Sequence, residues 1–281
     1  MENRKSYPTV FKDINNAEDL VRYLCDDVKR LSNSGYIYHY TKLSSLIKII
    51  KNKRLLLANA ADMNDKLEFK NGDMNKWPNI FFSSFMTEDR ESIGMWSMYA
   101  QPWDKGVKIA IPSNIARNWI HSISEIEEIS KTDNTPTGRK VLIDNNQLKL
   151  ASVVYSNTDS LTKKDVVEKL CWSNVVNTNF KNAAYRKELT GYIKDMAWSY
   201  EKEIRIRVEF NNLEGFEKVS INIPDEVIES MIITASPLFE GDLSTELLNE
   251  TECQLSTDNS LFKERLNIKT ICQTCELRLA N

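Results

Sequence analysis

The segment Glu203–Phe210 constrains the fold more than any other part of the chain. Its letters, EIRIRVEF, alternate charged and apolar side chains without interruption. Because successive side chains of a β-strand point to opposite faces, this alternation predicts a half-buried strand with one charged face. That face would carry Glu203, Arg205, Arg207 and Glu209. The alternative is an ordinary solvated strand face with cross-strand ion pairs.

Apolar spacing and turn residues predict the other elements. Further strands are expected at 36–40, 54–58, 79–85, 106–111, 150–155, 219–223, the end of 227–234, and near 266–271. Helices are expected at 17–32, 43–53, 92–100, over most of 161–195, and from 244 onward. Thr41 can cap the helix that starts at Leu43, and the polar stretch 121–138 reads as an exposed loop.

These elements do not follow a strict strand–helix–strand alternation, so the predicted class is α+β, with a mixed, largely antiparallel sheet or sheets flanked by helices. The chain has 281 residues, of which 41% are hydrophobic, which is enough for a large core. We expect an N-terminal helical segment at 1–35, a single α+β core domain at 36–240, and a C-terminal helix and strand extension of that domain at 241–281.

Composition excludes several classes of protein. The chain has 37 basic and 40 acidic residues, a net charge of −3, which argues against a general nucleic-acid coat. No apolar run approaches the roughly 18 residues of a membrane helix, and the start of the chain does not resemble a secretory signal. Five scattered cysteines suggest reduced thiols in the cytoplasm. No membrane partner is expected, and the oligomeric state stays open.

Several common motifs are missing. The eight glycines never cluster, so neither a Walker-type loop nor the dinucleotide-binding glycine turn is present. A nucleotide would have to be bound without a glycine loop. Only two histidines occur, His39 and His121, so any histidine chemistry depends on one of them. Cys272 and Cys275 form a C-x-x-C pair without a second pair, and we expect ordinary thiols and no metal there.

Two constellations could carry chemistry. His39 stands between two tyrosines at the predicted end of a strand, just before a helix, where functional residues often lie. Glu201 and Glu203 form a Glu-x-Glu pair, and paired carboxylates can perform acid–base chemistry, bind a metal or stabilise a cation. For each, a structural role is the alternative.

Two further groups are weaker. Asn64, Asp65 and Glu68 fall in a predicted loop and could bind a metal, but residues of this kind more commonly begin a helix or form a turn. Met95, Trp96 and Tyr99 have helical spacing, and such side chains more often pack in the hydrophobic core than contact a ligand.

Taken together, these pieces resemble DUF2971, a bacterial family of unknown function. In chain order they are Tyr-His-Tyr-Thr (38–41), Asn-Asp-x-x-Glu (64–68), Phe-Ser (82–83), Met-Trp-x-x-Tyr-Ala (95–100), Lys-Gly-Val (105–107) and Trp-x-Tyr-Glu-x-Glu-x-Arg (198–205). The resemblance extends from about Tyr36 to Pro237. The sequence departs from the family at Met63, Lys66 and Ile204, where an aromatic, a proline and a tryptophan are usual.

The chain is more distantly similar to the ADP-ribosyltransferase superfamily of the His-Tyr-Glu type. The resemblance implies an ADP-ribosyltransferase-like fold, NAD as substrate, and Glu203, His39 and Glu201 as catalytic residues. Glu203 would stabilise the ribosyl cation, His39 would bind the ribose, and Tyr99 or Trp96 would stack on nicotinamide. The implied NAD-binding set is His39, Tyr40, Thr41, Ser83, Trp96, Tyr99 and Arg205. The pair Ser83 and Ser84 is also similar to the serine-rich strand of the superfamily's arginine-modifying branch.

The function expected from this resemblance is that of an NAD-dependent ADP-ribosyltransferase or NAD glycohydrolase, as a toxin or antiphage effector. Its partners would be NAD and a macromolecular acceptor, either protein or nucleic acid. One alternative is a non-catalytic module that binds a nucleotide or nucleic acid. Another is a metal-dependent nuclease that uses Asp65, Glu68 and the Glu201–Glu203 pair. The transferase hypothesis requires His39, an aromatic ring and Glu203 to converge on one cleft.

Overall fold

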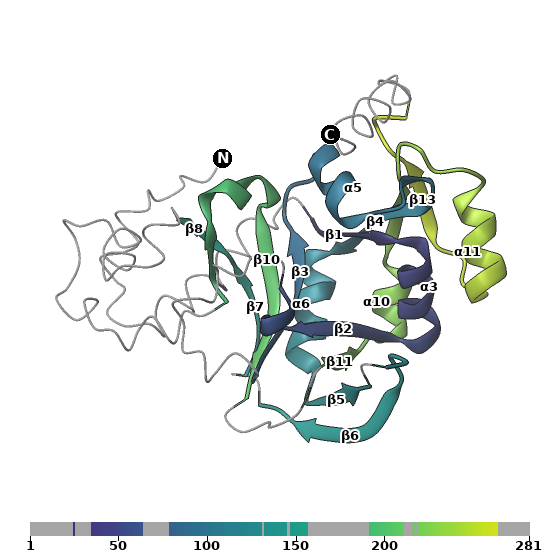
Figure 1. The fold of residues 1–281 in the computed structure, drawn as a ribbon. Coiled ribbons are helices and arrows are strands. Elements are labelled where there is room, and N and C mark those ends of the chain that lie inside the picture. Colours follow the sequence, from purple (N-terminus) through teal and green to yellow (C-terminus); the bar gives the residue numbers. More distant parts are fainter. Residues whose placement is uncertain are drawn as a thin grey trace. The chain divides into compact units, whose positions relative to one another are not determined.

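The computed structural model describes residue 25 and the ranges 35–63, 79–130, 132–144, 147–156, 191–210, 216 and 218–263 (Figure 1). The chain forms two compact units, and each is assembled from separate stretches of sequence. Apart from residue 25, the described part of unit 1 lies within Leu55–Thr87 and Arg117–Asn222. The described part of unit 2 lies within Gly35–Arg54, Glu88–Ala116 and Ile223–Asn281.

Unit 1 is built on antiparallel strands. Its elements are β2 (Arg54–Asn59), η3 (Ala60–Asp62), β3 (Ile80–Met86), most of α6 (Ser113–Ser122), β5 (Glu125–Ile129), β6 (Pro136–Leu142), β7 (Leu148–Ser152), β8 (Val154–Ser156), β9 (Ile193–Asp195), η7 (Met196–Glu201), β10 (Glu203–Glu209) and β11 (Lys218–Asn222). The strand order runs β3-β2-β11-β5-β6, and β10 pairs with both β3 and β7. β8 and β9 form a separate parallel pair.

Strand β10 confirms the predicted strand but corrects its environment. Ile204, Ile206 and Val208 are fully buried on one face, as the alternation predicts. The opposite face is also buried, because Glu203, Arg205 and Arg207 are each at most 4% exposed. β3 and β7 flank this strand on both sides over most of its length. The expectation of a half-buried strand is therefore wrong, and so is the alternative of a solvated face with ion pairs.

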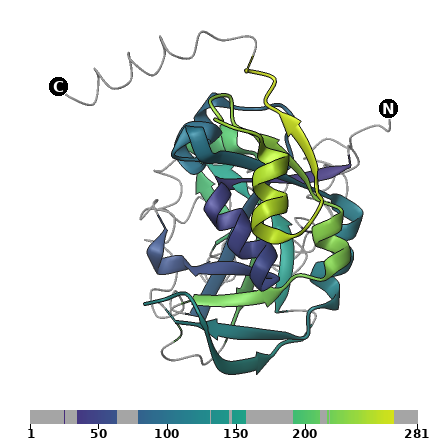
Figure 2. The same ribbon diagram turned by 90° about the vertical axis from the view of Figure 1, so that its right-hand side faces the viewer.

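Unit 2 contains a smaller sheet with helices. Its elements are β1 (Tyr36–Lys42), α3 (Leu43–Asn52), α5 (Ile93–Tyr99), η5 (Trp103–Lys105), β4 (Gly106–Pro112), α10 (Asp225–Glu229), β12 (Ile232–Ala235), α11 (Leu243–Thr251) and β13 (Ser256–Asn259). The order is β13-β12-β4-β1, antiparallel except for β12 and β13. Helices α3 and α11 lie side by side (Figure 2), joined by an ion pair between Lys51 and Glu250 at 3.0 Å.

The α+β class with largely antiparallel sheets is confirmed by these pairings. The strands expected around β1, β2, β3, β4 and β11 are all present, as are helices α3, α5 and α11. No helix within the described residues is long and apolar enough to cross a membrane. The strand expected near 266–271, most of the helix at 17–32 and the stretch 161–190 lie outside the described residues.

Three local expectations are corrected. Thr41 does not cap α3, because it still pairs with Val107 in the β1–β4 ladder, and Lys42 takes the N-cap position. The stretch 121–138 is not a loop, since β5 and β6 form a hairpin around a turn in which the Thr135 amide donates to Asp133. The end of the helix expected at 161–195 is strand β9 instead.

Candidate active site

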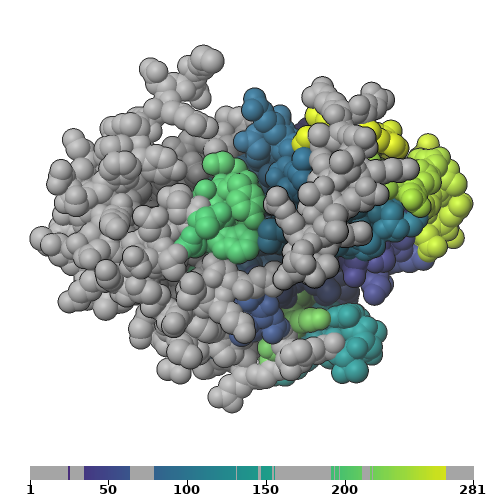
Figure 3. Space-filling model, turned by 45° about the horizontal axis from the view of Figure 1, so that its top comes forward, coloured from purple at the N-terminus to yellow at the C-terminus, as the bar shows by residue number. Residues whose placement is uncertain are grey.

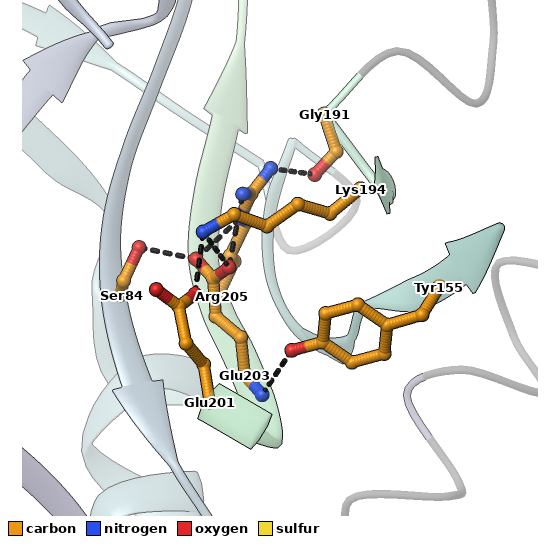
Figure 4. A network of polar contacts seen from close by, with 7 residues as sticks. All are labelled: Ser84, Tyr155, Gly191, Lys194, Glu201, Glu203 and Arg205. Atoms are coloured by element: carbon orange, nitrogen blue, oxygen red, sulfur yellow. Dashed lines mark hydrogen bonds and ion pairs between the residues drawn. The ribbon is translucent and has the colours of Figure 1, made fainter. Parts of the chain in front are cut away.

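Glu203 stands at the start of β10 and is held there by neighbouring strands (Figure 4). In antiparallel pairs, side chains that lie opposite each other share a face. Ser84 of β3 is opposite Arg205, so its hydroxyl reaches the charged face and donates to Oε1 of Glu203. Arg205 donates to the same carboxylate from Nε at 2.7 Å and from a terminal nitrogen at 3.1 Å.

Lys194 of β9 joins the two glutamates predicted to act together. Its ammonium is 2.5 Å from Oε2 of Glu201 and 3.1 Å from Oε2 of Glu203. Between these glutamates, Lys202 adopts a left-handed conformation with φ of 46°, which ends η7 and starts β10. The predicted pair is therefore one site, bridged by a lysine that lies nine residues before Glu203.

Backbone contacts fix the position of this network. The amide of Glu203 donates to the hydroxyl of Tyr155 at 2.7 Å, and its carbonyl accepts from the amide of Val153 at 3.0 Å. The guanidinium of Arg205 donates to the carbonyl of Gly191 at 2.8 Å and lies 4.2 Å from the centre of the Phe82 ring. Two carboxylates and two cations are thus buried with balanced charge.

The electrostatics of the network keep Glu203 ionised. Burial alone would raise its pKa, but the charges of Arg205 and Lys194, with hydrogen bonds from Arg205 and Ser84, lower the pKa to about 2. Burial would lower the pKa of Lys194, and the two carboxylates outweigh that effect, so its pKa is raised. Glu203 is therefore a carboxylate near neutral pH, able to face a developing positive charge.

Metal binding gains no support from this arrangement. The carboxylates of Glu201 and Glu203 accept from cationic side chains, where a metal ion would have to compete with Lys194 and Arg205. No group of three or more metal-ligating side chains comes together in the described part of the chain. Asn64, Asp65 and Glu68 lie outside the described residues.

Unit 2 holds the predicted site residues of β1 and α5. Along β1 the side chains alternate, so His39 and Thr41 share one face and Tyr40 points to the other. The Trp96 ring packs edge-on against Tyr40 with ring centres 4.8 Å apart, and its indole nitrogen donates to Glu91 at 3.0 Å. Trp96 is fully buried. Of the two aromatic candidates, only Tyr99 is partly exposed.

The structure separates some of the predicted residues. Ser83 points to the face opposite Glu203, and it is Ser84 that contacts the carboxylate. Glu201, Glu203 and Arg205 meet within unit 1, whereas His39 and Tyr99 belong to unit 2, and the convergence of the two groups stays a prediction. Sequence reasoning missed Lys194 and Tyr155, for which no local pattern gives a signal, and it placed Ser84 only within a serine pair.

Comparisons with known proteins add two findings. A family model described as "Protein of unknown function (DUF2971)" matches residues 95–206, which confirms that resemblance over this stretch. None of the curated proteins matches the chain. Among solved structures, the chain is similar to Thermus sp. 2.9 DarT in complex with carba-NAD+, at 9% identity and a TM-score of 0.32, over 82% of this chain and 97% of that one.

Proposed function

We propose that the chain is an NAD-dependent ADP-ribosyltransferase or NAD glycohydrolase, in which Glu203 stabilises the ribosyl cation. The observation that carries this proposal is the Ser84–Glu203 hydrogen bond, which sets an ionised carboxylate at the start of β10 against a serine of β3. Ser83 and Ser84 resemble the serine-rich strand of the superfamily's arginine-modifying branch, and this resemblance supports the proposal. The buried and fully hydrogen-bonded carboxylate is preorganised, as charge stabilisation in a transition state requires.

The proposed reaction breaks the bond between nicotinamide and ribose. The bonding electron pair leaves with nicotinamide, and a positive charge develops on the ribose. Glu203 would stabilise this charge, while Glu201 would orient the sugar or the acceptor. Water or an acceptor then supplies a lone pair to the ribose carbon and loses a proton to solvent. His39, Tyr40, Thr41 and Tyr99 of unit 2 are the proposed NAD-binding residues.

A macromolecular acceptor, protein or nucleic acid, belongs to the same proposal, as does a role as a cytoplasmic toxin or antiphage effector. The alternative is a non-catalytic module that binds a nucleotide. It is favoured by one observation, that both carboxylate oxygens of Glu203 already accept hydrogen bonds within the protein.

The test follows nicotinamide release from NAD+ by mass spectrometry, with and without cell lysate. Glu203→Gln should reduce release at least about hundredfold, because it removes the stabilising charge. Ser84→Ala should reduce it about tenfold, the effect of losing one hydrogen bond to a charged group. Glu209→Gln is the matched control, because it is the same substitution in the same strand, at a carboxylate that pairs with Arg207 at 2.6 Å.

Folding of each variant is checked by thermal unfolding. Glu203→Asp keeps the negative charge but shortens the side chain by one methylene group. This variant therefore still tests the position of the carboxylate if Glu203→Gln does not fold. Release dependent on lysate would indicate a macromolecular acceptor. Release unaffected by Glu203→Gln and Glu203→Asp would exclude the proposed role, and NAD+ binding without any release would favour the non-catalytic module.

A further inference from the structure

Lys194 occupies an unusual position for a lysine. Its ammonium lies between the carboxylates of Glu201 and Glu203 and 4.9 Å from the centre of the Trp198 ring. Trp198 and Tyr200, both on η7, lie with ring centres 6.3 Å apart, and Tyr200 is 41% exposed. Figure 3 shows this part of the chain at the surface, in green. Carboxylates beside aromatic rings form the kind of site that binds organic cations.

The two cations of the network are held differently. Arg205 is anchored by the Gly191 carbonyl and by Phe82, in addition to Glu203. The Lys194 ammonium is held by the two carboxylates and the Trp198 ring, all of which are side chains. A lysine is a point charge on a flexible four-carbon stem. Lys194 can therefore leave Oε2 of Glu203 and keep Glu201 and Trp198, while Ser84 and Arg205 still hold Oε1.

We propose that the Lys194 ammonium occupies the place of a ligand's cationic group, and that a flat organic cation such as a pyridinium ring displaces it from Glu203. The identification of that ring with the nicotinamide of NAD+ rests on the proposed function. With Lys194 in place, the carboxylates and cations of the network cancel. Once the ammonium has moved away, Glu203 faces the ligand with Arg205 as its remaining cationic partner among the described side chains, so the site attracts positive charge.

The test compares binding of two small probes by calorimetry. They are the 1-methylnicotinamide cation and neutral nicotinamide, which share a ring and differ in charge. Lys194→Met keeps the length of the side chain and removes its charge, so the cation should bind about tenfold more tightly, a change of about 1.4 kcal/mol, while nicotinamide binding is unchanged. Lys194→Arg keeps the charge and should show no gain.

Lys105→Met is the matched control. Lys105 also pairs with a carboxylate, Glu246, at 2.9 Å, and lies 5.3 Å from the centre of the Phe239 ring, but it belongs to unit 2. This substitution should leave the preference between the two probes unchanged. A wild-type readout that needs no variant is the side-chain nitrogen resonance of Lys194, which should shift with the cation and not with nicotinamide.

The outcomes separate this inference from the proposed function. If Lys194→Met binds the cation more tightly but the protein releases no nicotinamide from NAD+, the cation site would be supported and the proposed enzyme activity would be excluded. Release that depends on Glu203, with no change in preference in Lys194→Met, would overturn the inference alone. The inference would also be overturned if the cation bound neither the wild type nor Lys194→Met. If Lys194→Met does not fold, a Lys194 resonance that does not shift when the cation is added to the wild type would overturn it.

Discussion

Glu203 keeps its negative charge although it is almost entirely inaccessible to water. A buried charge is tolerated when charged partners and hydrogen bonds compensate for its lost hydration. Here Arg205, Lys194 and Ser84 supply that compensation. Removal of one of these side chains would leave a buried charge without its full set of partners. The stability and the proposed activity of this site therefore depend on the same contacts.

Acid should destabilise the protein through Glu203. Its pKa in the folded state is lowered to about 2 from an ordinary value of 4.5. The unfolded state therefore binds this proton first, and the stabilisation is complete above about pH 5 and is lost as the pH falls toward 2. Each pKa unit corresponds to about 1.4 kcal/mol. Urea unfolding of the wild type should lose stability over this range more steeply than unfolding of Glu203→Gln, and equal slopes would contradict the prediction.

Trp96 and Tyr99 should behave differently although they lie on the same short helix. Trp96→Phe keeps the buried ring but removes the donor to Glu91, so the free energy of unfolding should fall by about 1–3 kcal/mol while NAD+ affinity is retained. Tyr99→Leu should weaken NAD+ binding up to about tenfold with little change in stability. Denaturant unfolding and calorimetry measure the two effects. The reverse pattern would assign the stacking role to Trp96.

The junction between η7 and β10 determines how Glu201 and Glu203 face Lys194. It depends on Lys202, whose left-handed backbone disfavours side chains with a β-carbon and most of all β-branched ones. The geometry of the site therefore depends on this short connection, because a single residue separates the two glutamates whose carboxylates Lys194 bridges.

Substitutions of Lys202 should therefore have opposite signs. Lys202→Gly should raise the free energy of unfolding by up to about 1 kcal/mol, and Lys202→Val should lower it by about 1–2 kcal/mol. Denaturant unfolding measures both. Glu252→Gly is the matched control, because Glu252 has φ of 59° at the end of α11, far from η7 in sequence. Only Lys202→Val should also reduce the activity assigned to Glu203, and a stabilising valine would refute the account.

Sequence patterns predict a strand well where apolar letters alternate with charged ones or follow one another in a short run. β10 has the alternating letters EIRIRVEF and β3 has the mainly apolar run of residues 80–85, and both strands were predictable. β6 has neither pattern, because nearly all its side chains are exposed, and its only partner among the described strands is β5. The burial of the charged face of β10 was not predictable, because a local pattern does not reveal what covers a strand. For the same reason Lys194 and Tyr155, which reach Glu203 from other strands, had no signature.

At the scale of the whole molecule, the last described elements belong to unit 2. β13 pairs with β12, and Glu91 accepts a hydrogen bond from the amide of Leu261 at 3.0 Å. α11 contributes an ion pair between Glu246 and Lys105. Elements α11 and β13 therefore contact residues from the middle of the sequence, while the assignment of 241–281 as an extension of the core domain stays a prediction.

Shortening the chain tests this dependence. A version that ends at residue 240 loses α11 and β13, and we expect its melting temperature to fall by several degrees, since about 1 kcal/mol corresponds to about 2–4 °C in a protein of this size. A version that ends at residue 263 keeps both elements and is the control. Equal melting temperatures for the two versions would show that α11 and β13 do not stabilise unit 2.

The chain passes between the two units five times, at residues 34–35, 54–55, 87–88, 116–117 and 222–223. On the ribosome, a protein whose domains follow one another can fold each domain as it emerges. The two units of this protein cannot fold in that way, because their segments alternate along the chain. Unit 1 lacks β11 until synthesis has passed Asn222, and unit 2 lacks β12 and β13 until later still. The earlier segments of both units must therefore wait in an incomplete state, and the buried charges around Glu203 come together only after Arg205 has been synthesised.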